Sequence, residues 1–299
     1  MAAAADVRFD VAIAGRGMKL AISNIAWNAP LEARVGDRLQ ALGVTGIEIA
    51  PSKVHPQPLE ATDADLARYR DFWESRGIAI VAMQALLFGR NDLHLFRDEA
   101  SRRSMRDYLA GICRFAGKVG AQSLVFGSPK NRLKGDLSPA AAREIAIPFF
   151  REVGQVAERE GTWLCIEHNP PEYGADFVTT SAEALDLVVA VNQPGFGLHL
   201  DTGGLTLAHE STETLSHAGA WWRHFHISEP NLAPIGDPSA PDAVDVNARH
   251  ARYGTALKQS GYSGWISLEM KTLPDDRALE CISQAVEFAR KHYDGRSSS

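Results

Sequence analysis

Four side chains that commonly bind divalent metals lie at or near the ends of four successive apolar runs. They are Glu167 in WLCIE, Asp201 in FGLHLD, His226 in HFHIS and Glu269 in WISLEM. Three carboxylates and one imidazole are suitable ligands for a divalent cation such as Mn²⁺, Mg²⁺, Co²⁺ or Zn²⁺. A cation held in this way polarises the oxygen atoms of a substrate. The residue types therefore predict a site for one divalent metal ion.

The runs that carry these residues belong to a longer series. Each run is short and apolar or β-branched, and a polar loop and a segment with helical period follow it. The expected strands cover 20–24, 46–50, 78–84, 123–127, 163–167, 196–201, 224–228 and 265–270. The expected helices cover 31–43, 63–77, 99–120, 138–161, 181–191, 246–261 and 275–293. This alternation predicts an α/β fold, a (β/α)8 TIM barrel in a single domain.

A doubly wound nucleotide-binding sheet is the alternative fold. The loop SNIAWNAP follows the first expected strand and contains no Gly-rich phosphate fingerprint, which disfavours that alternative. The barrel is expected over residues 18–293, with an N-terminal extension at 1–17 and a C-terminal tail at 294–299.

Active sites of such barrels lie at the carboxyl ends of the strands. Side chains two residues apart share one face of a strand, and four pairs with this spacing end the last four strands. The pairs are Cys165 and Glu167, His199 and Asp201, His224 and His226, and Ser267 and Glu269. Glu48 and Gln84 occupy the same late position on the second and third strands. We therefore expect these polar groups to meet in the mouth of the barrel.

Composition excludes several other classes of protein. The 299 residues carry a formal net charge of -6 and no Lys/Arg-rich run, which disfavours a nucleic-acid-binding surface. The three cysteines are far apart and form no CxxC pair, so a disulfide framework is not expected and a reducing cytoplasm is the expected location. No run of about eighteen uncharged apolar residues is present, so no membrane span is expected. The acidic and basic residues near the N-terminus argue against a signal peptide.

Several motifs together resemble one known family. In order along the chain, MKLAISNIAW, VFGSPKNR, IEHNPPEYG, HLDTGG, HFHISEP and GWISLEMK are similar to motifs of the sugar phosphate isomerase/epimerase family, the xylose-isomerase-like TIM barrels. The resemblance extends from about Met18 to about Tyr293. It implies that Glu167, Asp201, His226 and Glu269 coordinate one divalent cation. It also implies that Glu167 and Glu269 are the two catalytic acid/base groups.

The activity that this resemblance implies is a metal-dependent isomerase or epimerase acting on a sugar or sugar derivative. Removal of a proton next to a carbonyl forms an enediolate, whose negative oxygens a cation stabilises. Epimerisation needs an acid on the far face of the carbon, whereas aldose–ketose isomerisation can return the proton to the same face. Two carboxylates suit either outcome.

Two positions depart from the ketose 3-epimerases of this family. Those enzymes commonly have a His three residues after the metal Asp and an Arg six residues after the metal His, where this chain has Gly204 and Leu232. Lys130 and Arg132 offer an alternative pair for a phosphate, a carboxylate or a polar polyol. The residues expected to contact substrate are Asn24, Glu48, Gln84, Lys130, Arg132, His199 and Glu229.

Two other functions remain open at this point. One is a metal-dependent lyase or dehydratase that acts on a keto-cyclitol or a 3-keto-glycoside with the same metal and base. The other is a barrel that binds a ligand without turnover. The expected binding partner is a sugar-like small molecule, and neither nucleic acid nor a membrane is expected to bind. A homodimer is possible, because barrels of this family often pair.

Overall fold

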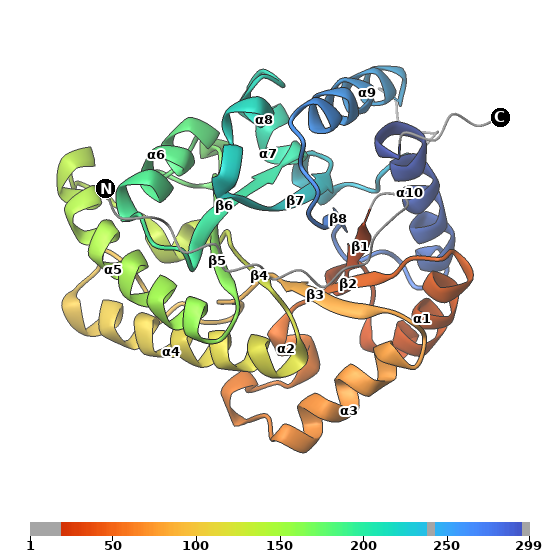
Figure 1. The fold of residues 1–299 in the computed structure, drawn as a ribbon, viewed down its shortest axis with the longest axis horizontal. Coiled ribbons are helices and arrows are strands. Elements are labelled where there is room, and N and C mark those ends of the chain that lie inside the picture. Colours follow the sequence, from red (N-terminus) through yellow and green to blue (C-terminus); the bar gives the residue numbers. More distant parts are fainter. Residues whose placement is uncertain (1–18, 238–242, 295–299) are drawn as a thin grey trace.

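The barrel is closed by eight parallel strands that follow one another in sequence order, with β8 beside β1 (Figure 1). The structure is a computed structural model that describes residues 19–237 and 243–294. Its strands are β1 (Leu20–Ser23), β2 (Gly46–Ile49), β3 (Ala79–Met83), β4 (Ser123–Phe126), β5 (Trp163–Glu167), β6 (Phe196–Asp201), β7 (Trp222–Ser228) and β8 (Ile266–Glu269). The single-domain (β/α)8 barrel expected from the alternation is confirmed. The expected extension, and the expected tail beyond Asp294, lie outside the described residues.

Helices surround the barrel on its outer side (Figure 1). They are α1 (Glu32–Ala41), α2 (Pro51–Val54), α3 (Asp63–Glu74), α4 (Glu99–Val119), α5 (Pro139–Arg159), α6 (Ser181–Val191), α7 (Thr202–Leu207), α8 (Thr214–His217), α9 (Ala243–Gln259) and α10 (Ala278–Tyr293). None of the helical ranges named from the sequence lies between β6 and β7, where the structure has α7 and α8. None of the described helices combines the length and apolar composition needed to cross a bilayer.

The long helices α4 and α5 show how local sequence sets the elements. Asp98 and Ser138 cap them, because each side chain accepts a hydrogen bond from a backbone N–H in the first turn. At the other end of α4, Gly120 adopts a left-handed conformation with φ 89° that stops the helix. The buried residues of α5 recur at helical spacing and place one apolar face against the barrel.

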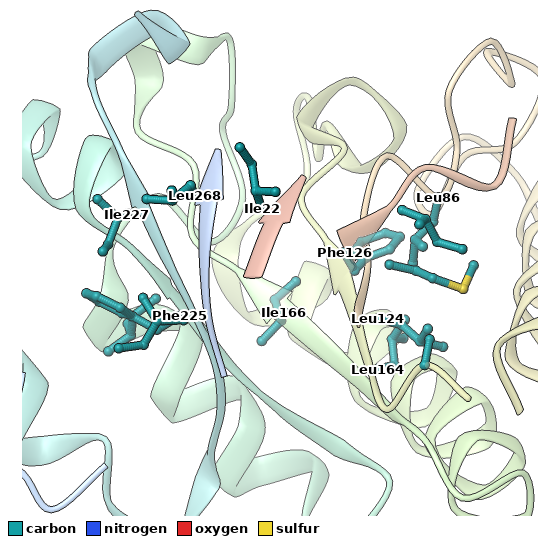
Figure 2. Packing of buried hydrophobic residues seen from close by; sticks show 14 of the residues in the cluster. Ile22, Leu86, Leu124, Phe126, Leu164, Ile166, Phe225, Ile227 and Leu268 are labelled. Atoms are coloured by element: carbon teal, nitrogen blue, oxygen red, sulfur yellow. The ribbon is translucent and has the colours of Figure 1, made fainter. Parts of the chain in front are cut away.

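The main hydrophobic core lies between the sheet and the helices. Ile22, Leu124, Ile166, Phe225 and Leu268 project from five strands into one buried cluster (Figure 2). Most residues that alternate with them are small or polar, although Val125 beside Leu124 is apolar. Ala21 belongs to a separate small cluster with Val81 and Ala82. The outer face of the strands therefore provides most of the apolar packing, and the inner face is left for polar groups.

Strand register brings the predicted metal ligands to one edge of the barrel. Glu167 is opposite His199 in the β5–β6 pair, and Asp201 is opposite His226 in the β6–β7 pair. Ser228, two residues beyond His226, is opposite Glu269 on β8. Four neighbouring strands therefore present inward side chains near their carboxyl ends to the same space.

Candidate functional site

One group of candidate metal ligands in the site contains Asp201, His226 and Glu269. One ligand atom from each of these three buried residues lies within 4.8 Å of the other two. The Nδ1 atom of His226 is 3.1 Å from Oε2 of Glu269. The carboxyl ends of β6, β7 and β8 therefore supply two carboxylates and an imidazole to one point.

Hydrogen bonds fix the carboxylate of Asp201. Its Oδ1 accepts a hydrogen bond of 2.5 Å from the Ser228 hydroxyl, and its Oδ2 accepts one of 2.7 Å from the Gly204 backbone N–H. The second bond makes Asp201 the N-cap of α7. Ser228 was not expected at the site from the sequence, although its spacing of two residues from His226 predicts that both side chains share one face of the strand.

Glu167 approaches His226 from β5. Glu167, His199 and His226 form a second group whose ligand atoms lie within 4.8 Å of one another. Oε1 of Glu167 is 3.5 Å from Nε2 of His199, and its Oε2 accepts a hydrogen bond of 3.2 Å from Asn169. The structure therefore gathers the other three predicted ligands around His226, which belongs to both groups and also to a third with Glu48 and His224. Asn169 is a further contact that the sequence did not indicate.

The carboxylates of the cluster are costly to ionise together. Burial and then the charges of Glu269 and Asp201 raise the pKa of Glu167 to about 8. Burial and then the charge of Glu269 raise the pKa of Asp201 to about 6. Burial disfavours the charged form of His226, but the carboxylates of Glu48 and Glu269 outweigh it and raise its pKa well above the usual value. Ionisation of all these carboxyls would therefore concentrate negative charge in a buried space.

A single divalent cation fits this set of donors. Carboxylate oxygens and an imidazole nitrogen suit Mn²⁺, Mg²⁺, Co²⁺ and Zn²⁺. A cation also favours the ionised carboxylates that burial and mutual repulsion disfavour. Glu167, Asp201, His226 and Glu269 are the residues that would hold it.

Three residues expected to contact substrate lie on the first three strands or just after them. Glu48 on β2 is fully buried, with Oε2 2.8 Å from Nε2 of His226. Gln84, which follows β3, donates a hydrogen bond of 2.5 Å to the hydroxyl of Ser23. The side chain of Asn24, after β1, accepts a hydrogen bond from the Ala50 N–H and donates one to the Tyr69 hydroxyl. These two amide side chains bond to neighbouring parts of the protein.

The expected anion-binding pair, Lys130 and Arg132, is divided by the structure. Lys130 is exposed, whereas Arg132 is 1 % exposed. Four hydrogen bonds of 2.7–2.9 Å run from the Arg132 guanidinium to other protein groups. The acceptors are the backbone carbonyls of Gly127, Phe177 and Glu167 and the side chain of Asn169. Arg132 therefore ties the loops around Glu167 together.

The last two expected contacts have different surroundings. His199 is fully buried beside His226, with ring centroids 4.1 Å apart. Glu229 follows β7, and its Oε1 and Oε2 bond to His250 at 2.7 Å and to Arg249 at 2.5 Å. Both of these partners belong to α9, so the Glu229 carboxylate anchors that helix.

Known structures share this fold at low sequence identity. D-psicose 3-epimerase with D-tagatose, from Clostridium cellulolyticum H10, matches with a TM-score of 0.74 and 18% identity, over 92% of this chain and 99% of that one. Apo 3-keto-D-glucoside 4-epimerase from E. coli matches with a TM-score of 0.73 and 16% identity, over 91% and 98%. The IOLI protein with a bound zinc atom matches with a TM-score of 0.67 and 20% identity, over 92% and 98%.

At the level of sequence, the chain matches a family model but no individual curated protein. The family model described as the xylose isomerase-like TIM barrel matches residues 37–292, which include all four predicted metal ligands. This match agrees with the resemblance seen in the motifs and covers most of the chain. The protein belongs to the xylose isomerase-like TIM barrel family.

Proposed function

We propose that this protein is a divalent-metal-dependent isomerase or epimerase that acts on a sugar or sugar derivative. The observation that carries the proposal is the cluster at the carboxyl ends of four neighbouring strands, where the buried Asp201, His226 and Glu269 meet the partly buried Glu167. Two of the structural neighbours are named as sugar epimerases and a third as a zinc-containing protein, which supports the same reaction class.

The four proposed metal ligands would have different roles in the reaction. A bound cation would polarise the substrate's carbonyl and hydroxyl oxygens and stabilise the negative charge of an enediolate. Glu167 and Glu269 come from β5 and β8, which β6 and β7 separate. They would remove a proton from the carbon next to the carbonyl and return one to it. Asp201 would stay fixed, because Ser228 and Gly204 hold both of its oxygens.

The surroundings of Arg132 favour an uncharged sugar over a phosphorylated one. A substrate phosphate requires a positively charged or hydrogen-bond-donating partner. Arg132, the buried guanidinium near the cluster, donates its hydrogen bonds to backbone carbonyls and to Asn169. The exposed Lys130 is a weaker candidate, because a solvated ammonium contributes little to binding. We therefore expect free ketoses and keto-sugars to be better substrates than their phosphates.

Solvent exchange tests the function directly. The metal-loaded protein should incorporate deuterium from D₂O into a true substrate at the carbon next to the carbonyl. Glu269→Gln should lower that exchange by about 10²–10⁴-fold, because it removes an acid/base group. Glu280→Gln is the matched control, because Glu280 is an exposed glutamate on α10. The screen should pair each free sugar with its phosphate.

Other results of the exchange experiment would indicate a different function or a different role for Glu269. Full exchange in Glu269→Gln would refute the role given to Glu269. A product that has lost the mass of water would identify a dehydratase, since isomers keep their mass. Sugar binding that needs no metal and leads to no exchange would identify a non-catalytic barrel.

A further inference from the structure

A fourth carboxylate, that of Glu48, contacts the cluster and is not among its predicted metal ligands. Glu48 projects from β2 and reaches His226 on β7, 178 positions away in the sequence. Both side chains are completely buried, and Oε2 of Glu48 is 2.8 Å from Nε2 of His226. A buried carboxylate needs a partner, and His226 is the closest partner of Glu48.

The two nitrogens of His226 face different groups. Nδ1 is 3.1 Å from Oε2 of Glu269, which is a predicted metal ligand, and Nε2 is 2.8 Å from Oε2 of Glu48, which is not. A neutral imidazole has one N–H donor and one lone pair. An ionised carboxylate can only accept, so each of the two favours a proton on the nitrogen that it faces. A metal ion that replaces the proton on Nδ1 would leave the other proton on Nε2, where Glu48 holds it.

We propose that Glu48 is a positioning residue that fixes the tautomer and the ring orientation of His226 for metal binding through Nδ1. The proposal rests on the metal-dependent function proposed above. Carboxylates that accept the second N–H of a metal-bound His orient the ring and increase its basicity. Glu48 was expected from the sequence to contact substrate, and this geometry gives it a different task.

The neighbouring histidines do not share this arrangement. His224 lies 3.5 Å from Oε1 of Glu48, and His199 lies 3.5 Å from Oε1 of Glu167. Neither ring has a hydrogen-bond partner within the described part of the chain. Of the three rings, only His226 has a carboxylate within 3.1 Å of each nitrogen. This difference singles out the Glu48–His226 pair as the oriented one.

Glu48→Gln is the direct test. Glutamine has nearly the same shape, but it has no charge and can present either an oxygen or an NH₂ group to Nε2, so the tautomer is no longer enforced. Competition with a fluorescent chelator should show that Zn²⁺ and Mn²⁺ bind about 10–100-fold more weakly than to the wild type. Glu229→Gln is the matched control. The buried carboxylate of Glu229 is hydrogen-bonded to a different histidine, His250, which is not part of the cluster. Its metal affinity should stay within twofold of the wild type.

Long-range ¹H–¹⁵N correlation of the zinc-loaded wild type provides a second readout, which does not depend on whether the variant folds. We expect a proton on Nε2 of His226 and none on Nδ1, and a proton on Nδ1 would overturn the proposal. Unchanged metal affinity in a folded Glu48→Gln protein would also overturn it, while the metal function would stand. If the wild type itself binds neither Zn²⁺ nor Mn²⁺, the proposed function fails together with this inference.

Discussion

Glu167 and Asp201 are acids whose surroundings disfavour their charge. Burial and neighbouring charges raise the pKa of Glu167 to about 8 and that of Asp201 to about 6. A metal ion binds the ionised forms, so metal binding must displace the protons that these carboxyls hold. Metal affinity and pH are therefore linked through these two residues.

Metal affinity should rise with pH between about 6 and 8. Protons compete with the cation below the pKa of about 8 of Glu167, so each displaced proton changes the Kd by up to about tenfold per pH unit. Titrations with Mn²⁺ at pH 6, 7 and 8 would measure the slope. Glu167→Gln should bind more weakly and with a smaller slope, because one titrating ligand is gone. A Kd that is the same at all three pH values would contradict this account.

The connection after β4 shows how an element positions a residue of another strand. Gly127 follows β4, and a Cβ at this position would lie 2.3 Å from Oε2 of Glu167. Arg132, the last residue of the 3-10 turn Pro129–Arg132, donates hydrogen bonds to the carbonyls of Gly127 and Glu167. The β4 loop therefore leaves space for the Glu167 carboxylate and holds its backbone.

Gly127→Ala should impair the site more than it affects folding. The added methyl group displaces the end of the Glu167 side chain, which is flexible, so we expect about 1 kcal/mol or less of lost stability. Deuterium exchange should fall by tenfold or more, because a small displacement of a catalytic group is costly. Thermal melts and exchange rates would be measured on the same samples. Gly135→Ala, on the same connection but with a positive φ and an open surrounding, is the contrasting variant: it should lose stability and keep its exchange rate.

At the scale of the molecule, the repeating pattern was predictable and the cross-barrel contacts were not. Apolar runs located the ends of β5 and β6, and β7 begins two residues before its expected start. Periodicity is a local property, so it indicates which face a residue occupies and not what it meets. The Glu48–His226 contact joins distant strands. Arg132 and Glu229 were expected to contact substrate, and the structure shows them bonded to protein groups.

Metal loading should stabilise the whole barrel. The proposed ligands come from β5, β6, β7 and β8, so one cation would join half of the strands. A ligand at 100 times its Kd stabilises the folded state by about 2.7 kcal/mol. Scanning calorimetry should therefore show a Tm several degrees higher with Mn²⁺ than after chelation. In Asp201→Ala the two values should nearly coincide, and a large remaining difference would place the binding site elsewhere.

The division between the two faces of the strands has an evolutionary consequence. Apolar side chains such as Ile166 and Phe225 hold the helices to the sheet, while their immediate neighbours Glu167 and His226 line the interior. Exchange of an inward residue leaves the outer packing intact, and exchange of an outward residue leaves the interior chemistry intact. Selection can therefore alter the reaction and the durability of this scaffold at adjacent positions, largely independently of one another.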